Sequence, residues 1–264
     1  MLKLHHISTT FNEGTLDEKK ALRSINLSLK PGEFVTVIGG NGAGKSTLLN
    51  VISGIQPPDV GDILIGDQGV THLPEYKRAA YIGRVFQDPM AGTAPSMTIE
   101  ENLAMAYSRN RRRTLKLGVS KKRKELFKTY LETLNLGLEN RLSAKVGLLS
   151  GGERQALSLL MATFTEPNIL LLDEHTAALD PSRAELITQL TEEVVRKFDL
   201  TTLMVTHNMQ QALDLGDRLF MMDAGEIIFD VTGKEKEKLT IEGLMHEFQK
   251  RRGIQFKDDR AVLG

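Results

Sequence analysis

The stretch GGNGAGKSTLLN, residues 39–50, follows the apolar segment EFVTVI and decides how the rest of the chain is interpreted. It has four glycines in its first six residues, then a lysine, two hydroxyl side chains and an apolar run. Glycines let successive backbone N–H groups turn inward around an anion, and a helix that begins near Lys45 adds its positive end. The spacing G-x-x-x-x-G-K-[ST] therefore predicts a phosphate-binding loop between a buried strand and a helix.

In such a loop each side chain has a distinct task on a nucleoside triphosphate. Lys45 reaches the β- and γ-phosphates, the Ser46 hydroxyl suits a Mg²⁺ ion, and Thr47 bonds near the α-phosphate. A glycine turn beside an unrelated lysine is the alternative, and the position between a strand and a helix disfavours it. We therefore predict that the loop binds a nucleoside triphosphate together with Mg²⁺. The backbone cradle comprises Gly39, Gly40, Asn41, Gly42, Ala43 and Gly44.

Composition narrows the class of protein further. The chain has 264 residues, of which 41% are hydrophobic and 26% charged, and this suits a soluble globular protein with a sizeable core. It has no cysteine, which excludes disulfides and thiolate metal sites, and its six histidines lack metal-ligand spacing. No stretch approaches the ~20 apolar residues that cross a bilayer, so we expect no membrane span. A net charge of zero argues against nucleic acid as a partner.

Charge is nevertheless uneven along the chain. Residues 109–124 carry nine basic and no acidic residues. A basic surface of this kind can face phosphates or anionic lipid, whereas the simpler interpretation is a solvated loop and helix start. The simpler interpretation is favoured, because no aromatic residue is interleaved for base stacking.

Apolar periodicity predicts an α/β protein in which strands alternate with helices around a parallel sheet. Between residues 88 and 149 helical spacing dominates, which predicts an inserted helical subdomain. The expected strands lie in residues 2–8, 25–38, 79–87, 168–174, 201–208 and 218–229, with a hairpin at 58–70. Within 25–38 a Pro-Gly turn precedes the buried apolar strand. The expected helices are residues 46–55, 98–110, 121–136, 151–165, 181–198 and 208–214.

A second motif is the apolar strand ILLLDE, which ends in Asp173 and Glu174. Acids at the carboxyl end of a parallel strand lie where ligands bind. Asp173 is expected to hold Mg²⁺, and Glu174 to orient and polarise an attacking water. Together with the phosphate loop, this motif predicts a nucleoside triphosphatase.

A third motif, LLSGGERQ, places Ser150, Gly151 and Gly152 before an apolar helix. Ser150 and Glu153 have the spacing of a capping box, so a well-capped helix is one interpretation. Two glycines at a helix start are costly unless another molecule approaches the backbone closely, which indicates a second phosphate site. Two such sites can act on one γ-phosphate only from opposite sides, which suggests two copies of the chain closing face to face.

Residues 149–155 resemble the signature motif of ABC-type ATPases, and the resemblance extends from about residue 2 to 230. It implies that Gln87 contacts Mg²⁺ and the attacking water, and that Asp180 lies in a dimer-contact loop. It also implies that His207 is the switch histidine at the γ-phosphate and that Phe11 stacks on adenine, where the family more often has tyrosine. A core position is the alternative for His207 and Phe11, and a surface turn for Gln87.

One departure concerns the loop after Glu174. The family commonly has proline there, and this chain has His175. Proline stiffens a loop, so we expect histidine to loosen it and to be able to titrate, without a catalytic role.

The resemblance implies a P-loop NTPase fold of the ABC ATPase type. We expect a RecA-like mixed sheet core, an antiparallel β subdomain and an inserted α-helical subdomain within a single domain, 1–264. The core with its β subdomain is expected at 1–87 and 150–234, the helical subdomain at 88–149 and a short tail at 235–264.

The resemblance also implies partners and a location. Homodimers with composite ATP sites are expected at the cytoplasmic face of the membrane, bound peripherally to a separate permease through residues 88–106. The chain is similar to bacterial importer ATPases that work with a permease and a substrate-binding lipoprotein, and an amino-acid-like solute is the expected cargo. An exporter subunit, a soluble ABC-type ATPase acting on nucleic acid or ribosomes, and an inactive regulatory module are the alternatives.

Overall fold

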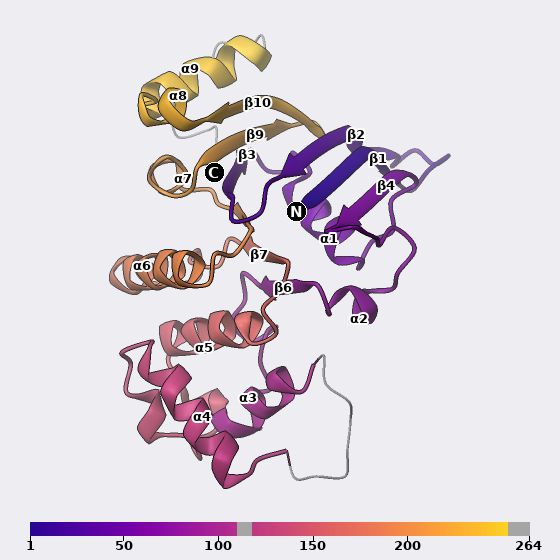
Figure 1. Ribbon diagram of the computed structural model, residues 1–264. Coiled ribbons are helices and arrows are strands. Elements are labelled where there is room, and N and C mark those ends of the chain that lie inside the picture. The colour runs from indigo at the N-terminus through magenta and orange to yellow at the C-terminus, as the bar shows by residue number, and fades with distance from the viewer. Residues whose placement is uncertain (110–117, 253–264) are drawn as a thin grey trace. The chain divides into compact units, whose positions relative to one another are not determined.

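The structure is a computed structural model that describes residues 1–109 and 118–252 (Figure 1). The chain divides into two compact units. The first unit comprises residues 1–78 and 199–264, and the second comprises residues 79–198. The subdomain boundaries predicted from the sequence stay predictions.

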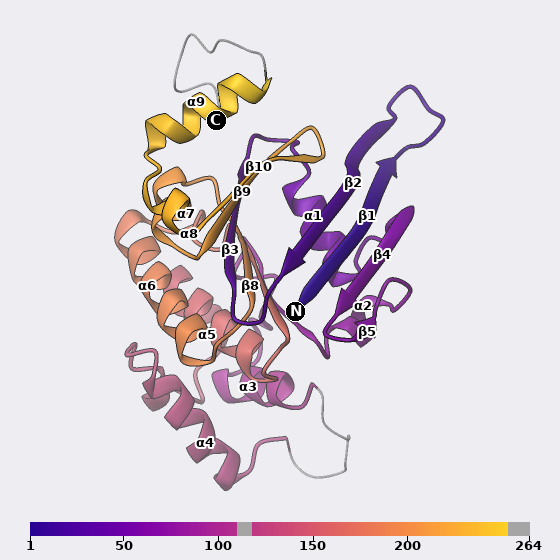
Figure 2. The same ribbon diagram turned by 45° about the horizontal axis from the view of Figure 1, so that its top comes forward.

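The first unit contains an antiparallel sheet whose strands lie in the order β2-β1-β4-β5. The strand β1 pairs along its length with β2, and the two form a long ribbon (Figure 2). The expected hairpin at 58–70 is present as the pair β4 and β5. The strands of this sheet are β1 (Leu2–Phe11), β2 (Lys19–Leu29), β4 (Val60–Ile65) and β5 (Gln68–Gly69).

The second sheet of this unit is mixed, in the order β10-β9-β3-β8. The strand β3 (Phe34–Gly39) is parallel to both neighbours, β8 (Thr202–Val205) and β9 (Arg218–Asp223), while β10 (Glu226–Thr232) is antiparallel to β9. All six residues of β3 are buried, as expected for a strand flanked on both sides in a parallel arrangement. The helices of the first unit are α1 (Lys45–Ser53), α2 (Glu75–Arg78), α7 (Met209–Asp214), α8 (Gly233–Glu237) and α9 (Ile241–Arg252).

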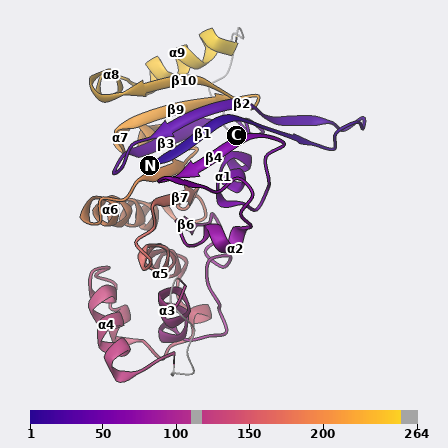
Figure 3. The same ribbon diagram turned by 45° about the vertical axis from the view of Figure 1, so that its right-hand side comes forward.

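The second unit is mainly helical, around one short parallel pair of strands. The strand β6 (Ile82–Val85) pairs in parallel with β7 (Ile169–Asp173). Helices α3, α4 and α5 pack against one another (Figure 3). The helical elements are α3 (Ile99–Tyr107), α4 (Lys121–Glu132), η1 (Leu138–Asn140), η2 (Val146–Leu148), α5 (Gly151–Thr163) and α6 (Pro181–Lys197).

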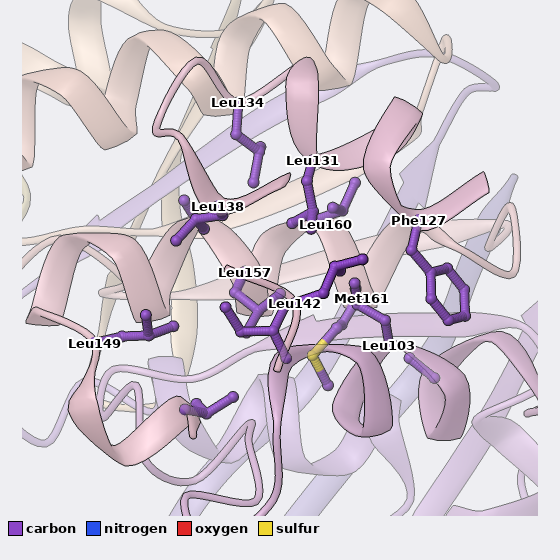
Figure 4. Close-up of a cluster of buried hydrophobic side chains, with 14 of the residues drawn as sticks. Leu103, Phe127, Leu131, Leu134, Leu138, Leu142, Leu149, Leu157, Leu160 and Met161 are labelled. Atoms are coloured by element: carbon purple, nitrogen blue, oxygen red, sulfur yellow. The ribbon is translucent and has the colours of Figure 1, made fainter. Parts of the chain in front are cut away.

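An apolar cluster holds the helices of the second unit together (Figure 4). Its members come from every long helix of the unit and from the turns between α4 and α5. Phe127 and Leu131 of α4 are fully buried here, as are Leu157 and Leu160 of α5. The helical spacing of apolar residues thus predicted real helices, which end within a few residues of the expected bounds. Of the basic run at 109–124, residues 110–117 lie outside the described part of the chain.

Candidate functional site: two motif sets, one in each unit

The phosphate loop joins β3 to α1 in the first unit. Gly39 has a φ of 156° and Gly44 a φ of 102°. A Cβ added at Gly39 would collide with the carbonyl oxygen of Met222, and one at Gly44 with the carbonyl oxygen of Ala21. Only glycine fits at either position, so the loop keeps its tight course over the end of the sheet. Helix α1 begins with no side-chain cap and no acidic residue in its first turn, which leaves its N-terminal N–H groups suited to an anion.

Lys45 lies inside this loop. Its side chain is buried, and its Nζ donates to the carbonyl oxygens of Gly39 at 2.7 Å and Gly40 at 3.2 Å. An ammonium folded against loop carbonyls places a positive charge where the loop would receive phosphate. The side chain of Ser46 is exposed and that of Thr47 half-buried.

The first unit also holds His207, close in the fold to the phosphate loop. His207 follows β8, and the N–H of the preceding Thr206 donates to the carbonyl of Val37 in β3 at 3.1 Å. Parallel strands end at the same edge of a sheet, so the β8 end with His207 and the β3 end with the phosphate loop are neighbours. His207 is half-buried, and Asn208 after it caps α7.

Phe11 lies at the end of β1, in register with Lys19 of β2. Its side chain is 37% exposed, so part of the ring is free of the core. The Lys19 ammonium reaches the phosphate loop, because a Cβ built at Gly42 would lie 3.5 Å from Lys19 Nζ. Sequence reasoning missed Lys19, whose only signal is its place eight residues after Phe11 in a run of charged residues.

The acidic motif ends β7 in the second unit. The Asp173 carboxylate pairs through Oδ2 with Nη2 of Arg84 at 2.9 Å, and the two side chains are only 14% and 10% exposed. Glu174 has a φ of +46°, a left-handed conformation that costs a non-glycine residue about 1 kcal/mol or more. The N–H of Ala177 closes the turn on the Glu174 carbonyl at 2.9 Å. Strain of this kind persists only where the surroundings impose it.

His175 supplies part of that constraint. Its ring is buried, with Nε2 2.9 Å from Oγ1 of Thr191 in α6. The Thr191 hydroxyl donates to the carbonyl of Ile187 at 2.7 Å, so Nε2 carries the hydrogen and donates to Thr191. Burial lowers the pKa of His175 to about 4. The expectation that His175 loosens the loop is therefore wrong: the neutral ring ties the loop to α6.

The signature motif begins α5 with the predicted capping box. Ser150 Oγ accepts from the Glu153 N–H at 3.3 Å, and the Ser150 N–H donates to Glu153 Oε2 at 2.7 Å. Burial raises the pKa of Glu153, but the bonds from Ser150 and the charge of Arg141 outweigh it, so the pKa lies below its ordinary value. The capping interpretation is thus confirmed as one role of Ser150.

The two signature glycines differ from those of the phosphate loop. Neither Gly151 nor Gly152 has a positive φ. A Cβ at Gly152 would make only ordinary contact with the Arg183 side chain, and one at Gly151 would meet the flexible end of Leu179. The described residues of the second unit therefore do not require glycine at position 152, and a shift of Leu179 would accommodate a Cβ at 151.

The remaining predicted residues lie at ends of elements in the second unit. Gln87 is exposed just beyond β6, and buried Gln155 of α5 donates through Nε2 to the Phe86 carbonyl beside it at 3.1 Å. Asp180 caps α6 by accepting from the Arg183 N–H at 3.2 Å.

Comparison with known proteins gives the family. The family model of ABC transporters matches residues 22–177. A tyrosine transport ATP-binding protein of Clostridioides difficile is 45% identical over 249 residues, 94% of this chain and 99% of that protein. The chain belongs to the ABC transporter family. The resemblance and the fold class predicted from the motifs are confirmed, and the chain is an ABC ATPase.

Another sequence relative of this ABC ATPase is named for a different cargo, and similar structures have been solved. A xylose/arabinose import ATP-binding protein of Sulfolobus acidocaldarius is 35% identical over 84% of this chain and 85% of that protein. A dimeric ATP-binding cassette bound to ADP and phosphate superposes with a TM-score of 0.75 at 30% identity, over 88% of this chain and 98% of that one. An ABC transporter cassette in its ADP conformation gives a TM-score of 0.77 at 28% identity, over 94% and 98%.

Within residues 1–109 and 118–252, no helix is long and apolar enough to span a bilayer. The same residues contain no cluster of three or more His, Cys, Asp or Glu side chains arranged to hold a metal ion.

Proposed function

We propose that this ABC ATPase is the ATP-hydrolysing subunit of an importer for a small amino-acid-like solute, working with a separate membrane permease. The observation that supports this most is the likeness to a tyrosine transport ATP-binding protein along almost the full length of both chains. Identity to the sugar import subunit is lower, which favours the amino-acid-like cargo over a sugar.

Residues of the first unit bind the nucleotide in this proposal. The loop Gly39–Gly44 and the start of α1 bind the phosphates, and Lys45 neutralises the β- and γ-phosphates. Phe11 stacks on adenine with its exposed face. His207 contacts the γ-phosphate and stabilises charge as the terminal bond breaks. The buried position of Lys45 in the loop supports its role, because the ammonium needs no large movement to meet a phosphate.

In this proposal Gln87, Asp173 and the base Glu174 come from the second unit, and Ser46 comes from the first. Ser46 of the loop, Gln87 and Asp173 present oxygen atoms, the ligand type that Mg²⁺ prefers, so this donor set fits the ion. Bound Mg²⁺ neutralises phosphate charge. Glu174 polarises the attacking water, and its imposed backbone conformation supports a role that needs a fixed carboxylate.

Two copies of the chain complete each ATP site in this proposal. Ser150, Gly151 and Gly152 of one copy bind the γ-phosphate held by the other, and Asp180 lies in the contact between copies. Gly152 supports this, since the fold of the second unit alone does not demand glycine at that position. Loss of the γ-phosphate then opens the dimer, which converts hydrolysis into motion.

The permease is proposed to bind residues 88–106 at the cytoplasmic face of the membrane. Met90 and Met105 in this stretch are 42% and 58% exposed, and exposed methionines favour contact with a partner protein. A substrate-binding protein would deliver the cargo to the permease.

Affinity isolation from membranes, with mass spectrometry of the bound proteins, tests this function. We expect a polytopic permease, and loss of the gene should abolish uptake of one or more radiolabelled amino acids. Recovery with ribosomes or DNA and no membrane protein would contradict the transporter proposal. Recovery of a permease with unchanged uptake but impaired efflux would replace importer by exporter.

A further inference from the structure

Arg84 is a charged residue of the second unit that the proposed function does not use. It lies in β6 beside Ile82 and Val85, which are 5% and 0% exposed. Its own side chain is only 10% exposed. Removing a guanidinium from water is costly unless a partner compensates, so its position needs a reason.

The guanidinium contacts both a carboxylate and an aromatic ring. Nη2 lies 2.9 Å from Oδ2 of Asp173, and Cζ lies 4.7 Å from the centre of the Phe86 ring. In the parallel pair Arg84 is opposite Leu171, and Asp173 is two residues further on the same face of β7, so the side chain reaches along the strand to its end. The ring and the carboxylate both stabilise this orientation of the guanidinium.

The Phe86 end of this arrangement is itself fixed. The buried amide of Gln155 in α5 donates to the Phe86 carbonyl at 3.1 Å. The guanidinium is thus supported by the helix that begins with the signature motif, and movement of Asp173 would break an ion pair.

The pair has a consequence for cation binding. A divalent cation is attracted by the full negative charge of a carboxylate, and a guanidinium at 2.9 Å offsets that charge. The ion pair uses Oδ2, and the carboxylate has a second oxygen that can serve as a ligand. Stability alone is a weak reason for such a pair, because a buried ion pair is often no better than two apolar side chains.

We propose that Arg84 pairs with Asp173 before the cation arrives and thereby lowers the affinity of the nucleotide site for the divalent cation. This rests on the proposed function, in which Asp173 is a Mg²⁺ ligand. Arg84 therefore raises the cation concentration at which the metal–nucleotide complex forms.

Binding of Mn²⁺ in the presence of a non-hydrolysable ATP analogue, followed by electron paramagnetic resonance, tests the proposal. Arg84→Met removes the charge and is expected to bind Mn²⁺ at least ~3-fold tighter, a conservative figure for losing a nearby positive charge. Arg84→Lys keeps the charge and should bind Mn²⁺ as the wild type does. Arg196→Met is the matched control, because Arg196 forms an ion pair with Glu192 on the exposed side of α6.

A double variant shows whether the effect acts through Asp173. In an Asp173→Asn background, adding Arg84→Met should leave Mn²⁺ affinity unchanged. Unchanged or weaker Mn²⁺ binding by folded Arg84→Met, or an equal effect in both backgrounds, would overturn the proposal. If Asp173→Asn alone binds Mn²⁺ as the wild type does, the proposed function of Asp173 is wrong instead. Arg84→Gln provides the same comparison if Arg84→Met does not fold.

Discussion

Individual residues around the acidic motif are held more firmly than their sequence context suggests. Glu174 adopts a left-handed backbone, and the residue after it anchors the turn to α6 through a buried hydrogen bond. Where proline would restrict the chain through its own ring, His175 restricts it through Thr191. Two chemical solutions thus produce the same outcome, a fixed glutamate.

His175 predicts a specific dependence of stability on pH. Its pKa is about 4 in the folded chain against 6.5 in the unfolded chain, so between these values the unfolded state binds more protons. The contribution of His175 to the free energy of unfolding is fully present above pH 6.5. It falls by about 3 kcal/mol as the pH drops to 4. Urea denaturation across this range should show the slope in the wild type and in His72→Gln, which alters an exposed histidine. A slope of the same size in His175→Gln would contradict this account.

Two helices of the second unit share one local motif, the capping box. Helices α3 and α5 both begin with a capping box, at Thr98 with Glu101 and at Ser150 with Glu153. The box satisfies N–H groups at each helix start in the same way. Only the second box is followed by two glycines, and its surroundings do not demand the one at position 152.

The two caps provide a matched pair of substitutions. Thr98→Ala and Ser150→Ala should each reduce the free energy of unfolding by about 1 kcal/mol, since each removes one cap. Only Ser150→Ala should also weaken ATP-dependent dimerisation, measured by light scattering in a Glu174→Gln background. Equal effects of both variants on dimerisation would mean that the Ser150 hydroxyl is no more than a cap.

The C-terminal helix α9 is part of the core of the first unit. Leu244 is 0% exposed and shares an apolar cluster with Ile38 of β3 and Ala212 of α7. Leu244→Ala should therefore lower the free energy of unfolding by about 3 kcal/mol, as for other buried leucines. Ile241→Ala, at a side chain that is 40% exposed on the same helix, should cost less than about 1 kcal/mol. If the urea midpoint of Leu244→Ala were as high as that of Ile241→Ala, α9 would not stabilise the unit.

At the scale of the whole molecule, the proposed chemistry is divided between two compact units. Lys45 and His207 belong to the first unit, whereas Asp173, Glu174 and Ser150 belong to the second. Hydrolysis in the proposed dimer therefore depends on both units of each chain and on two copies of that chain. Removing the Glu174 carboxylate should leave the proposed dimer closed, because ATP still binds but is no longer hydrolysed.

Glu174→Gln is accordingly expected to bind ATP, to hydrolyse it ~100-fold more slowly or worse, and to form a stable dimer. Size-exclusion chromatography with light scattering measures the mass with and without ATP. Lys45→Ala combined with Glu174→Gln is the control, and it should remain monomeric because phosphate binding is lost. A monomeric Glu174→Gln protein at saturating ATP would contradict the composite-site proposal.

The sequence by itself determined the α/β fold class and the phosphate loop, because these depend on local spacing: glycines before a lysine, acids after an apolar strand, apolar residues at helical intervals. The resemblance of residues 149–155 to a known signature motif led from there to the family. Tertiary structure alone decided the pairing of Arg84 with Asp173, 89 positions apart, and of His175 with Thr191. It also decided the approach of Lys19 to Gly42 and the burial of Leu244 beside Ile38. Such contacts depend on which elements fold against one another, and a side chain far along the chain leaves no local pattern to reveal its partner.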